Sequence, residues 1–303
     1  MRSSPVSEKI QKVLAQRGLG SRREIERWIA DGRIAVNGKT ASVGDRICAT
    51  DKVSLDGRPV RLRGKADRAR VLLYNKPVGE ICTRHDPEGR KNVFQALPPL
   101  ATGRWIAVGR LDINTSGLLL FTNEGELANR LMHPSQQIER QYLVRVHGGV
   151  DEAMLDRLLT GVELDDGPAR FDRIESGVRT GAHQWFSVTL TEGRQREVRR
   201  LWESQGVEVS RLKRIRFGSV EVPSYVRSGE WLELEPKEVA QLGRLVALSL
   251  RTPALTPEEK RSAGRQKTRL QARGRTSTRN AGRPERQRSS GKSSRQKPHD
   301  ARR

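Results

Sequence analysis

The uneven distribution of apolar residues limits how much of this chain can fold. Apolar residues are frequent up to about residue 250 and nearly absent after Leu270. Residues 251–303 hold 17 of the 58 Lys and Arg residues but 4 of the 36 Asp and Glu residues, so this segment carries +13 of the net charge of +22. Such a segment cannot bury enough apolar surface to offset the entropy lost on ordering. We therefore expect residues 251–303 to form a disordered basic tail after a folded part.

The folded part is also basic, with a net charge of +9 over residues 1–250. Neutralising a polyphosphate releases condensed counterions, which makes nucleic acid the expected partner. No basic amphipathic helix with a broad apolar face and no apolar run of membrane-spanning length accompanies this charge, so a membrane partner is not expected. The first residues also lack the apolar core of a signal peptide. We expect a cytoplasmic protein.

The residue types that build metal and disulfide sites are sparse. Cys48 and Cys82 stand far apart, and the five His residues are scattered without the spacing of metal ligands. We therefore expect neither a disulfide framework nor a metal site.

Residues 7–66 are predicted to form a small N-terminal domain of two helices followed by a sheet. Ser7 is a candidate cap for the first helix, and Ser21 with Glu24 three positions later forms a capping box for the second. Short strands are expected at 34–36 and 53–55, because hairpin-type Asn-Gly and Asp-Gly turns follow them.

Three arginines, Arg22, Arg23 and Arg27, project from the polar face of the second predicted helix. By themselves they fit a solvated face as well as a phosphate-binding one. The segment Gly20-Ser21-Arg22-Arg23 and the hairpin Val36-Asn37-Gly38-Lys39 resemble an S4 RNA-binding domain. This resemblance implies that the three arginines and Lys39 contact the RNA backbone.

A second domain is predicted over residues 70–250, after a polar linker at Arg61–Arg70. Val71–Tyr74 has the composition of a buried strand. Further strands are expected near residues 106–108, 118–121, 142–146, 185–190 and 231–234, and helices near 126–132, 151–159, 196–204 and 237–249. Several connections are too short for parallel crossovers, so we expect an α+β domain with a mixed, largely antiparallel sheet flanked by helices.

The most informative segment is the polar loop between the strands near 106–108 and 118–121. Its composition alone is also that of an ordinary turn. However, Gly109-Arg110-Leu111-Asp112 followed by Thr115-Ser116-Gly117-Leu118-Leu119-Leu120 resembles the signature loop of pseudouridine synthases of the RsuA/RluA superfamily. The resemblance implies that Asp112 is the catalytic aspartate and that Arg110 helps to flip or replace the target base.

Two further segments resemble motifs of the same superfamily. In Arg140-Gln141-Tyr142-Leu143-Val144, Tyr142 matches the active-site tyrosine, and strand alternation places it on one face with Val144 and Val146. In the segment 192–201, Arg199 matches the basic residue that pairs with the aspartate, and Arg200 is the alternative. The pair Arg196-Glu197 departs from the His-Gln of larger relatives. Arg194, Arg196 and Lys76, the last in Asn75-Lys76-Pro77-Val78-Gly79, are expected to contact substrate.

The segments 122–134 and 211–218 resemble the RluB branch in particular. The branch implies a cofactor-independent isomerase that converts a flipped uridine of 23S rRNA, or of a large-subunit precursor, to pseudouridine, acting as a monomer. Three alternatives remain at this point: a 16S rRNA synthase of the RsuA type, a non-catalytic rRNA-binding assembly factor, and a hydrolytic nucleosidase.

Overall fold

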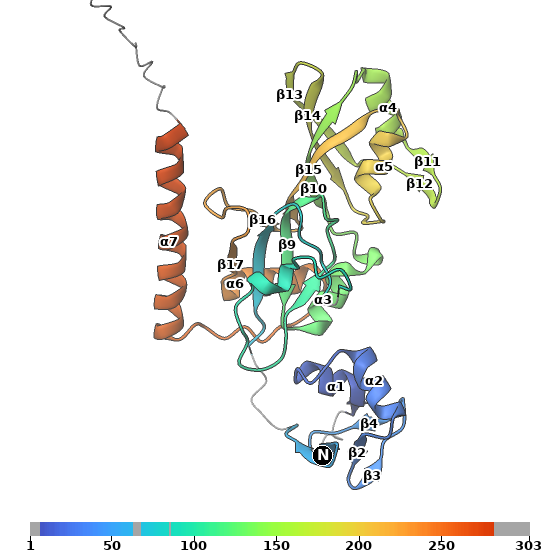
Figure 1. Cartoon of the computed structure of the whole chain (residues 1–303), viewed down its shortest axis with the longest axis vertical. Coiled ribbons are helices and arrows are strands. Elements are labelled where there is room, and N and C mark those ends of the chain that lie inside the picture. The colour runs from blue at the N-terminus through green and yellow to red at the C-terminus, as the bar shows by residue number, and fades with distance from the viewer. Residues whose placement is uncertain (1–6, 63–67, 85, 282–303) are drawn as a thin grey trace, which may run out of the picture.

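The computed structural model describes residues 7–62, 68–84 and 86–281, with side chains up to residue 273 (Figure 1). Part of the predicted linker, residues 63–67, and the end of the predicted tail, residues 282–303, lie outside the described residues. Figure 1 shows a small N-terminal domain in blue, a larger body built around a long sheet, and a C-terminal helix beside that body.

The N-terminal domain has the predicted order of two helices followed by a sheet. The helices are α1 (Ile10–Gln16) and α2 (Arg22–Ala30). The sheet follows the order β3-β2-β5-β6, and a further pair joins β1 to β4. These strands are β1 (Glu8–Lys9), β2 (Ile34–Val36), β3 (Lys39–Thr40), β4 (Arg46–Ile47), β5 (Val53–Leu55) and β6 (Arg58–Val60).

The start of α2 is capped as predicted, whereas the start of α1 is not. The side chain of Ser21 accepts from Glu24 N, and the Glu24 carboxylate accepts from Ser21 N, both at 3.1 Å. The predicted cap at Ser7 is wrong, because α1 begins only at Ile10 and the residues before it pair as β1 with β4.

The larger domain contains one nine-stranded sheet with the order β13-β14-β10-β15-β9-β7-β17, to which β16 and β8 add at β15 and β9. Within the described residues, β15 and β9 run parallel and the other neighbours in this sheet are antiparallel, which confirms the predicted mixed sheet. The strands are β7 (Val71–Lys76), β8 (Ile106–Val108), β9 (Ser116–Thr122), β10 (Arg140–His147), β13 (Arg173–Thr180), β14 (His183–Leu190), β15 (Glu208–Phe217), β16 (Val220–Glu221) and β17 (Trp231–Glu233).

Four α-helices follow the predicted positions in this domain, together with two short 3-10 helices and a small separate hairpin. They are α3 (Gly125–Met132), α4 (Glu152–Thr160), α5 (Glu197–Glu203), α6 (Pro236–Leu245), η1 (Val93–Ala96), η2 (Pro134–Gln136) and the hairpin β11 (Val162–Leu164) with β12 (Gly167–Ala169). α6 ends before the predicted Ser249, because the chain turns at Ala247, which has a φ of 50°.

The sheet has an apolar core on each face. Alternate residues of β7 and β9 point to opposite sides, so Leu72 and Leu119 join one cluster with α4 and α5, while Leu73 and Leu120 join another with α3 and α6. Burial on both faces explains why these strands appear in the sequence as continuous apolar runs.

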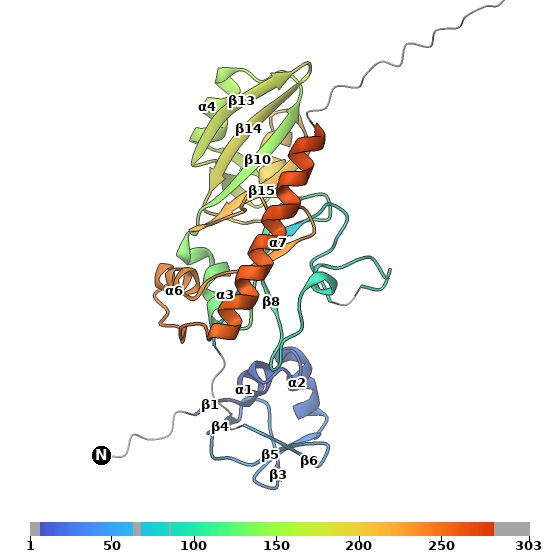
Figure 2. The same ribbon diagram turned by 90° about the vertical axis from the view of Figure 1, so that its left-hand side faces the viewer.

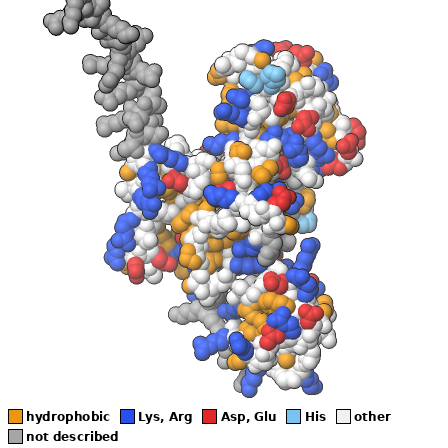
Figure 3. All heavy atoms as spheres, viewed as in Figure 1, with side chains coloured by type: hydrophobic (Ala, Val, Ile, Leu, Met, Phe, Trp, Pro, Cys, Tyr) orange, Lys and Arg blue, Asp and Glu red, His pale blue; other side chains and the backbone are white. Residues whose placement is uncertain are grey.

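Part of the segment predicted to be disordered is helical, because residues 257–281 form helix α7 (Pro257–Ala281). Its start is capped reciprocally by Thr256 and Glu259. Leu270 is buried in the second core cluster, and Gln266 Nε2 donates to Trp231 O at 3.0 Å. Both ribbon views show α7 beside the body (Figures 1 and 2), and Figure 3 shows Lys and Arg side chains over its outer side. A buried leucine, polar contacts with the body and helix-forming residues together favour a helix in a segment for which composition alone predicts disorder.

None of the helices in the described part of the chain is both long enough and apolar enough to cross a membrane.

Candidate active site

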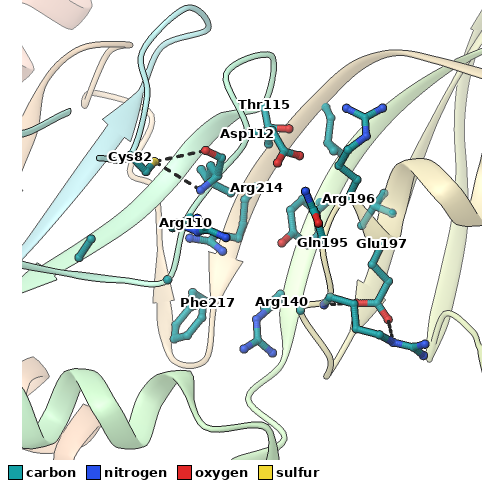
Figure 4. Close-up of a pocket in the computed structure, with 18 of the residues that line it drawn as sticks. Cys82, Arg110, Asp112, Thr115, Arg140, Gln195, Arg196, Glu197, Arg214 and Phe217 are labelled. Carbon is teal, nitrogen blue, oxygen red and sulfur yellow. Dashed lines mark hydrogen bonds and ion pairs between the residues drawn. The ribbon is translucent and has the colours of Figure 1, made fainter. Parts of the chain in front are cut away.

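A cleft of about 760 Å³ opens where the signature loop meets strands β10 and β15 and the segment that leads into α5 (Figure 4). Five of the predicted site residues line it: Asp112, Tyr142, Arg110, Arg194 and Arg196. These residues come from three segments far apart in the sequence. The fold therefore brings the three predicted motifs to one cavity.

The backbone of the signature loop is fixed by hydrogen bonds along its length. Five consecutive carbonyl oxygens of the loop each accept a hydrogen bond from outside the loop. In chain order the pairs are Cys82 Sγ to Leu111 O (3.2 Å), Lys76 Nζ to Asp112 O (3.1 Å), Gly79 N to Ile113 O (2.8 Å), Arg199 Nη2 to Asn114 O (2.9 Å) and Lys76 Nζ to Thr115 O (2.9 Å). Because each carbonyl is satisfied by a different part of the domain or by a buried ammonium, the main chain that carries Asp112 is held in one arrangement.

Lys76 lies under the loop, not in the cleft. Its side chain is fully buried, and its ammonium also donates to Pro77 O at 2.9 Å, so three carbonyls surround the charge. Burial lowers the pKa of Lys76, while nearby acidic groups, Asp112 among them, oppose that shift. This position does not support the predicted substrate contact, since the ammonium is enclosed by main-chain acceptors and does not line the cleft. We propose that Lys76 positions the loop.

Arg199 also supports the loop from behind. It is 6% exposed, and its guanidinium donates to Val209 O at 2.8 Å and to Asn114 O at 2.9 Å. Burial lowers the pKa of Arg199, and the charge of Asp112 acts in the opposite direction, so the two charges interact. Among the described residues no ion pair joins the two side chains, and the pairing of Arg199 with Asp112 stays a prediction.

Arg200, the alternative for that role, is engaged elsewhere. Its guanidinium makes two hydrogen bonds of 2.8 Å to the carboxylate of Asp166. This fork-to-fork pair ties α5 to the β11–β12 hairpin. Arg200 therefore stabilises the packing of the domain, and Arg199 is the arginine that contacts the signature loop.

Tyr142 has the predicted orientation. It is 8% exposed and lies in the same core cluster as Val144 and Val146, so alternation along β10 is confirmed. The ring forms part of the cleft wall while its other side packs on the core. A ring held in this way can stack against a base.

The three remaining predicted substrate contacts differ in how free they are. Arg110 is exposed, and Arg196 stands at the start of α5 with a single ion pair, 3.4 Å from Glu203. Arg194 contacts Glu192 at 2.7 Å and Asp166 at 3.2 Å. Arg110 and Arg196 therefore remain candidates for RNA contact, whereas the guanidinium of Arg194 already contacts two carboxylates of the protein.

Sequence reasoning assigned no role to two buried arginines that line the same cleft, Arg140 and Arg214. Both lie in segments that resemble pseudouridine synthase motifs, but the sequence does not show that their side chains face the cavity. The only available signal was the basic character of β10 and β15 at positions next to the motifs.

Comparison with known proteins agrees with this geometry. The family model described as RNA pseudouridylate synthase matches residues 70–204, and the S4 domain model matches residues 8–53. The chain is 54% identical over 272 residues to the ribosomal large subunit pseudouridine synthase B of Pseudomonas aeruginosa, covering 89% of this chain and 70% of that protein. The chain belongs to the RNA pseudouridylate synthase family.

Other relatives agree with the first. The enzymes named ribosomal large subunit pseudouridine synthase B from Pasteurella multocida and Escherichia coli K12 are 59% and 55% identical, with 80% and 84% of this chain and 71% and 89% of those proteins covered. A crystal structure of a pseudouridylate synthase shares the fold with a TM-score of 0.54 at 23% identity, covering 77% of this chain and 99% of that one. The catalytic domain is thus that of an isomerase, and the N-terminal domain is an S4 domain.

The predicted RNA contacts of the S4 domain lie at its surface. Arg22, Arg23 and Arg27 are exposed on α2, and Lys39 is exposed on β3. Exposure is compatible with phosphate contact, which stays a prediction for these four residues.

Proposed function

We propose that this chain isomerises a specific uridine of 23S rRNA, or of a large-subunit precursor, to pseudouridine, with Asp112 as the nucleophile. The observation that carries the proposal is that Asp112 and Tyr142 share one cleft, while the loop that bears Asp112 is held by five hydrogen-bonded carbonyls. The large-subunit assignment is supported by the names of relatives 54–59% identical to this chain.

The reaction exchanges one glycosidic bond for another. The C1′–N1 bond breaks, a C1′–C5 bond forms, the proton on C5 leaves, and N1 gains a proton. No atom is gained or lost, so the overall change needs neither a redox partner nor a group donor. A carboxylate can assist by attacking the sugar or the base as a nucleophile.

The surroundings of Asp112 fit that role. Two cations, Lys76 and Arg199, lie behind the loop, and both interact with the Asp112 charge. Fixed positive charge behind the loop helps to hold the carboxylate in one orientation. Tyr142 forms the wall against which the base can stack. We propose that Arg199 orients the loop and that Tyr142 holds the uracil and assists proton transfer.

The substrate has to present its uridine outside the helical stack. A nucleotide inside a duplex cannot reach a carboxylate within a cleft, so the target is expected in a loop or bulge and flipped out of the stack. Arg110 is exposed and is the candidate for helping to flip the base out of the stack. The S4 domain is the candidate for binding phosphates and positioning the RNA. We expect the chain to act as a monomer in the cytoplasm.

The proposal is tested by mapping pseudouridine in 23S and 16S rRNA from cells with and without the gene. We expect one 23S position to lose pseudouridine and to regain it with the wild-type chain but not with Asp112→Ala. Loss of a 16S position would assign the alternative substrate. Unchanged pseudouridine in both rRNAs would contradict the proposal and favour a non-catalytic role in ribosome assembly.

A further inference from the structure

Two arginines on the floor of the cleft approach the same aromatic ring. The guanidinium carbons of Arg140 and Arg214 lie 5.2 and 5.3 Å from the ring centre of Phe217 (Figure 4). Both residues are more than nine-tenths buried, at 8% and 4% exposure, and all three residues line the cleft. The structure therefore concentrates two positive charges at one side of the place where the reacting nucleotide has to lie.

A β-bulge creates this cluster. Arg140 pairs with Phe217 and Tyr142 pairs with Arg214, with a register shift between Gln141 and Tyr142. In a regular strand, residues 214 and 217 would point to opposite faces, because side chains alternate. The extra residue of the bulge restores them to one face. Arg214 thus faces the same side as Tyr142 and the cleft.

The two guanidinium groups lack an anionic partner within the described residues. The cleft is lined by two carboxylates, Asp112 and Glu197, and neither makes an ion pair with Arg140 or Arg214. Arg214 Nε donates to Leu118 O at 2.8 Å, while its Nη2 is buried with no hydrogen-bond partner.

In the described part of the chain, Arg140 donates to two main-chain oxygens, those of Ile138 and Thr191. Burial lowers the pKa of Arg140; Arg214 acts in the same direction, while Tyr142 and Glu197 act in the opposite direction. Arg140 and Arg214 are two buried positive charges, and Arg214 Nη2 is a donor without an acceptor. Such an arrangement is typical of an anion-binding site.

We propose that Arg214 and Arg140 form a phosphate subsite that binds a phosphodiester next to the extruded uridine. The proposal rests on the proposed function, because the anion is assigned from that substrate. Uracil and ribose are uncharged at neutral pH, so the anionic groups that enter the cleft with a flipped nucleotide are its flanking phosphates. Guanidinium groups bind phosphate oxygens through paired N–H donors. The hydrogen bond from Arg214 Nε to Leu118 O fixes the orientation of this guanidinium before a phosphate binds.

The test removes the negative charge of one phosphate in the RNA and, separately, the positive charge of Arg214. A 23S rRNA stem-loop that carries the target uridine is prepared unmodified, with one methylphosphonate on the 5′ side of that uridine, and with one on its 3′ side. Wild type and Arg214→Gln are compared for affinity and for the single-turnover rate of pseudouridine formation. A charge-assisted contact of this kind is expected to contribute about 10- to 100-fold.

We expect one of the two neutral linkages to weaken the wild type about 10-fold or more, and the same linkage to change Arg214→Gln less than about 2-fold. The inference is overturned if neither linkage affects the wild type, or if the effect is equally large in the variant. The wild-type arm needs no variant to fold. If the wild type forms no pseudouridine on unmodified RNA, the proposed function has failed, and the measured affinities still decide the phosphate subsite.

Arg216→Gln is the matched control. Arg216 lies two residues further along β15 but points to the opposite face, where it contacts Gln141 at 3.1 Å and Glu139 at 2.9 Å. The variant removes the same charge from the same strand, and we expect it to respond to the neutral linkages as the wild type does. Arg214→Lys keeps the charge without the planar fork and is expected to lose part of the effect.

Discussion

Gly117→Ala tests whether the parallel contact between β9 and β15 positions the catalytic loop. Gly117 has a φ of +101°, and a Cβ there would lie 2.1 Å from Arg214 O and 2.9 Å from Arg214 N. Both neighbours are main-chain atoms and cannot move aside alone. The two strands must therefore separate at the point where the loop enters β9, and the loop must shift relative to Arg214 and Tyr142.

The magnitude follows from two contributions. A non-glycine residue in this backbone conformation costs about 1–3 kcal/mol. Separation of the strands also disturbs the two pairs that join β9 to β15, Ser116 with Lys213 and Gly117 with Arg214, at about 1 kcal/mol for each hydrogen bond lost. We expect a total loss of about 3–5 kcal/mol in the free energy of unfolding. A displacement of about 1 Å in the loop lowers the rate about 100-fold.

Gly167→Ala separates the clash from the backbone strain. Gly167 lies in the same domain with a φ of +105°, and nothing stands within 4 Å of its Cβ position. Urea unfolding and the rate of pseudouridine formation are measured for both variants. We expect Gly167→Ala to lose about 1–3 kcal/mol and to stay active. If Gly117→Ala matches this control in both stability and rate, the close approach of the strands does not position the loop.

Three further variants probe the supports of the site. Lys76→Met removes one donor from each of the three carbonyls that its buried ammonium contacts, so we expect a loss of about 2–5 kcal/mol by thermal unfolding together with a lower kcat; wild-type stability would contradict this. Arg199→Lys cannot reach both Val209 O and Asn114 O, and steady-state kinetics should show kcat reduced about 10-fold or more with KM little changed; a change confined to KM would instead indicate substrate binding. Burial raises the pKa of Glu197 to about 6, so the folded state binds the proton more tightly than the unfolded state and loses stability as pH rises from about 4.5 to 6. Glu197→Gln should therefore be more stable than wild type by up to about 2 kcal/mol in urea at pH 7.5, with the difference gone at pH 4.5; an equal difference at both pH values would count against burial as the cause.

The sequence predicts much of the site because local patterns determine its elements. The apolar runs on both sides of the signature loop are strands, β8 half-buried and β9 buried on both faces, so the loop between them falls at a sheet end. Alternation along β10 is undisturbed from Tyr142 to Val146, which makes the orientation of Tyr142 readable from spacing alone.

Other parts of the site depend on contacts that no local pattern encodes. Strand β15 was not predicted, because its four basic residues and a bulge interrupt the alternation of apolar and polar residues. For the same reason the sequence did not indicate which way Arg214 points. The burial of Lys76 could not be foreseen either, since lysine is normally exposed and its three acceptors come from two separate segments. The order of α7 depends on contacts with distant residues as well, including the burial of Leu270 and the hydrogen bond from Gln266 to Trp231 O.

The most direct test of the account is the release of tritium from RNA labelled at C5 of uridine, measured for the wild type, Asp112→Asn and Asp112→Glu. Asparagine keeps the shape of the side chain without its charge, and glutamate keeps the charge but moves it by one methylene. Because the loop holds the main chain at residue 112 in place, we expect both variants to bind the RNA within about 2-fold of the wild type and to release no tritium. Sustained release by Asp112→Asn would show that the carboxylate is not the reacting group.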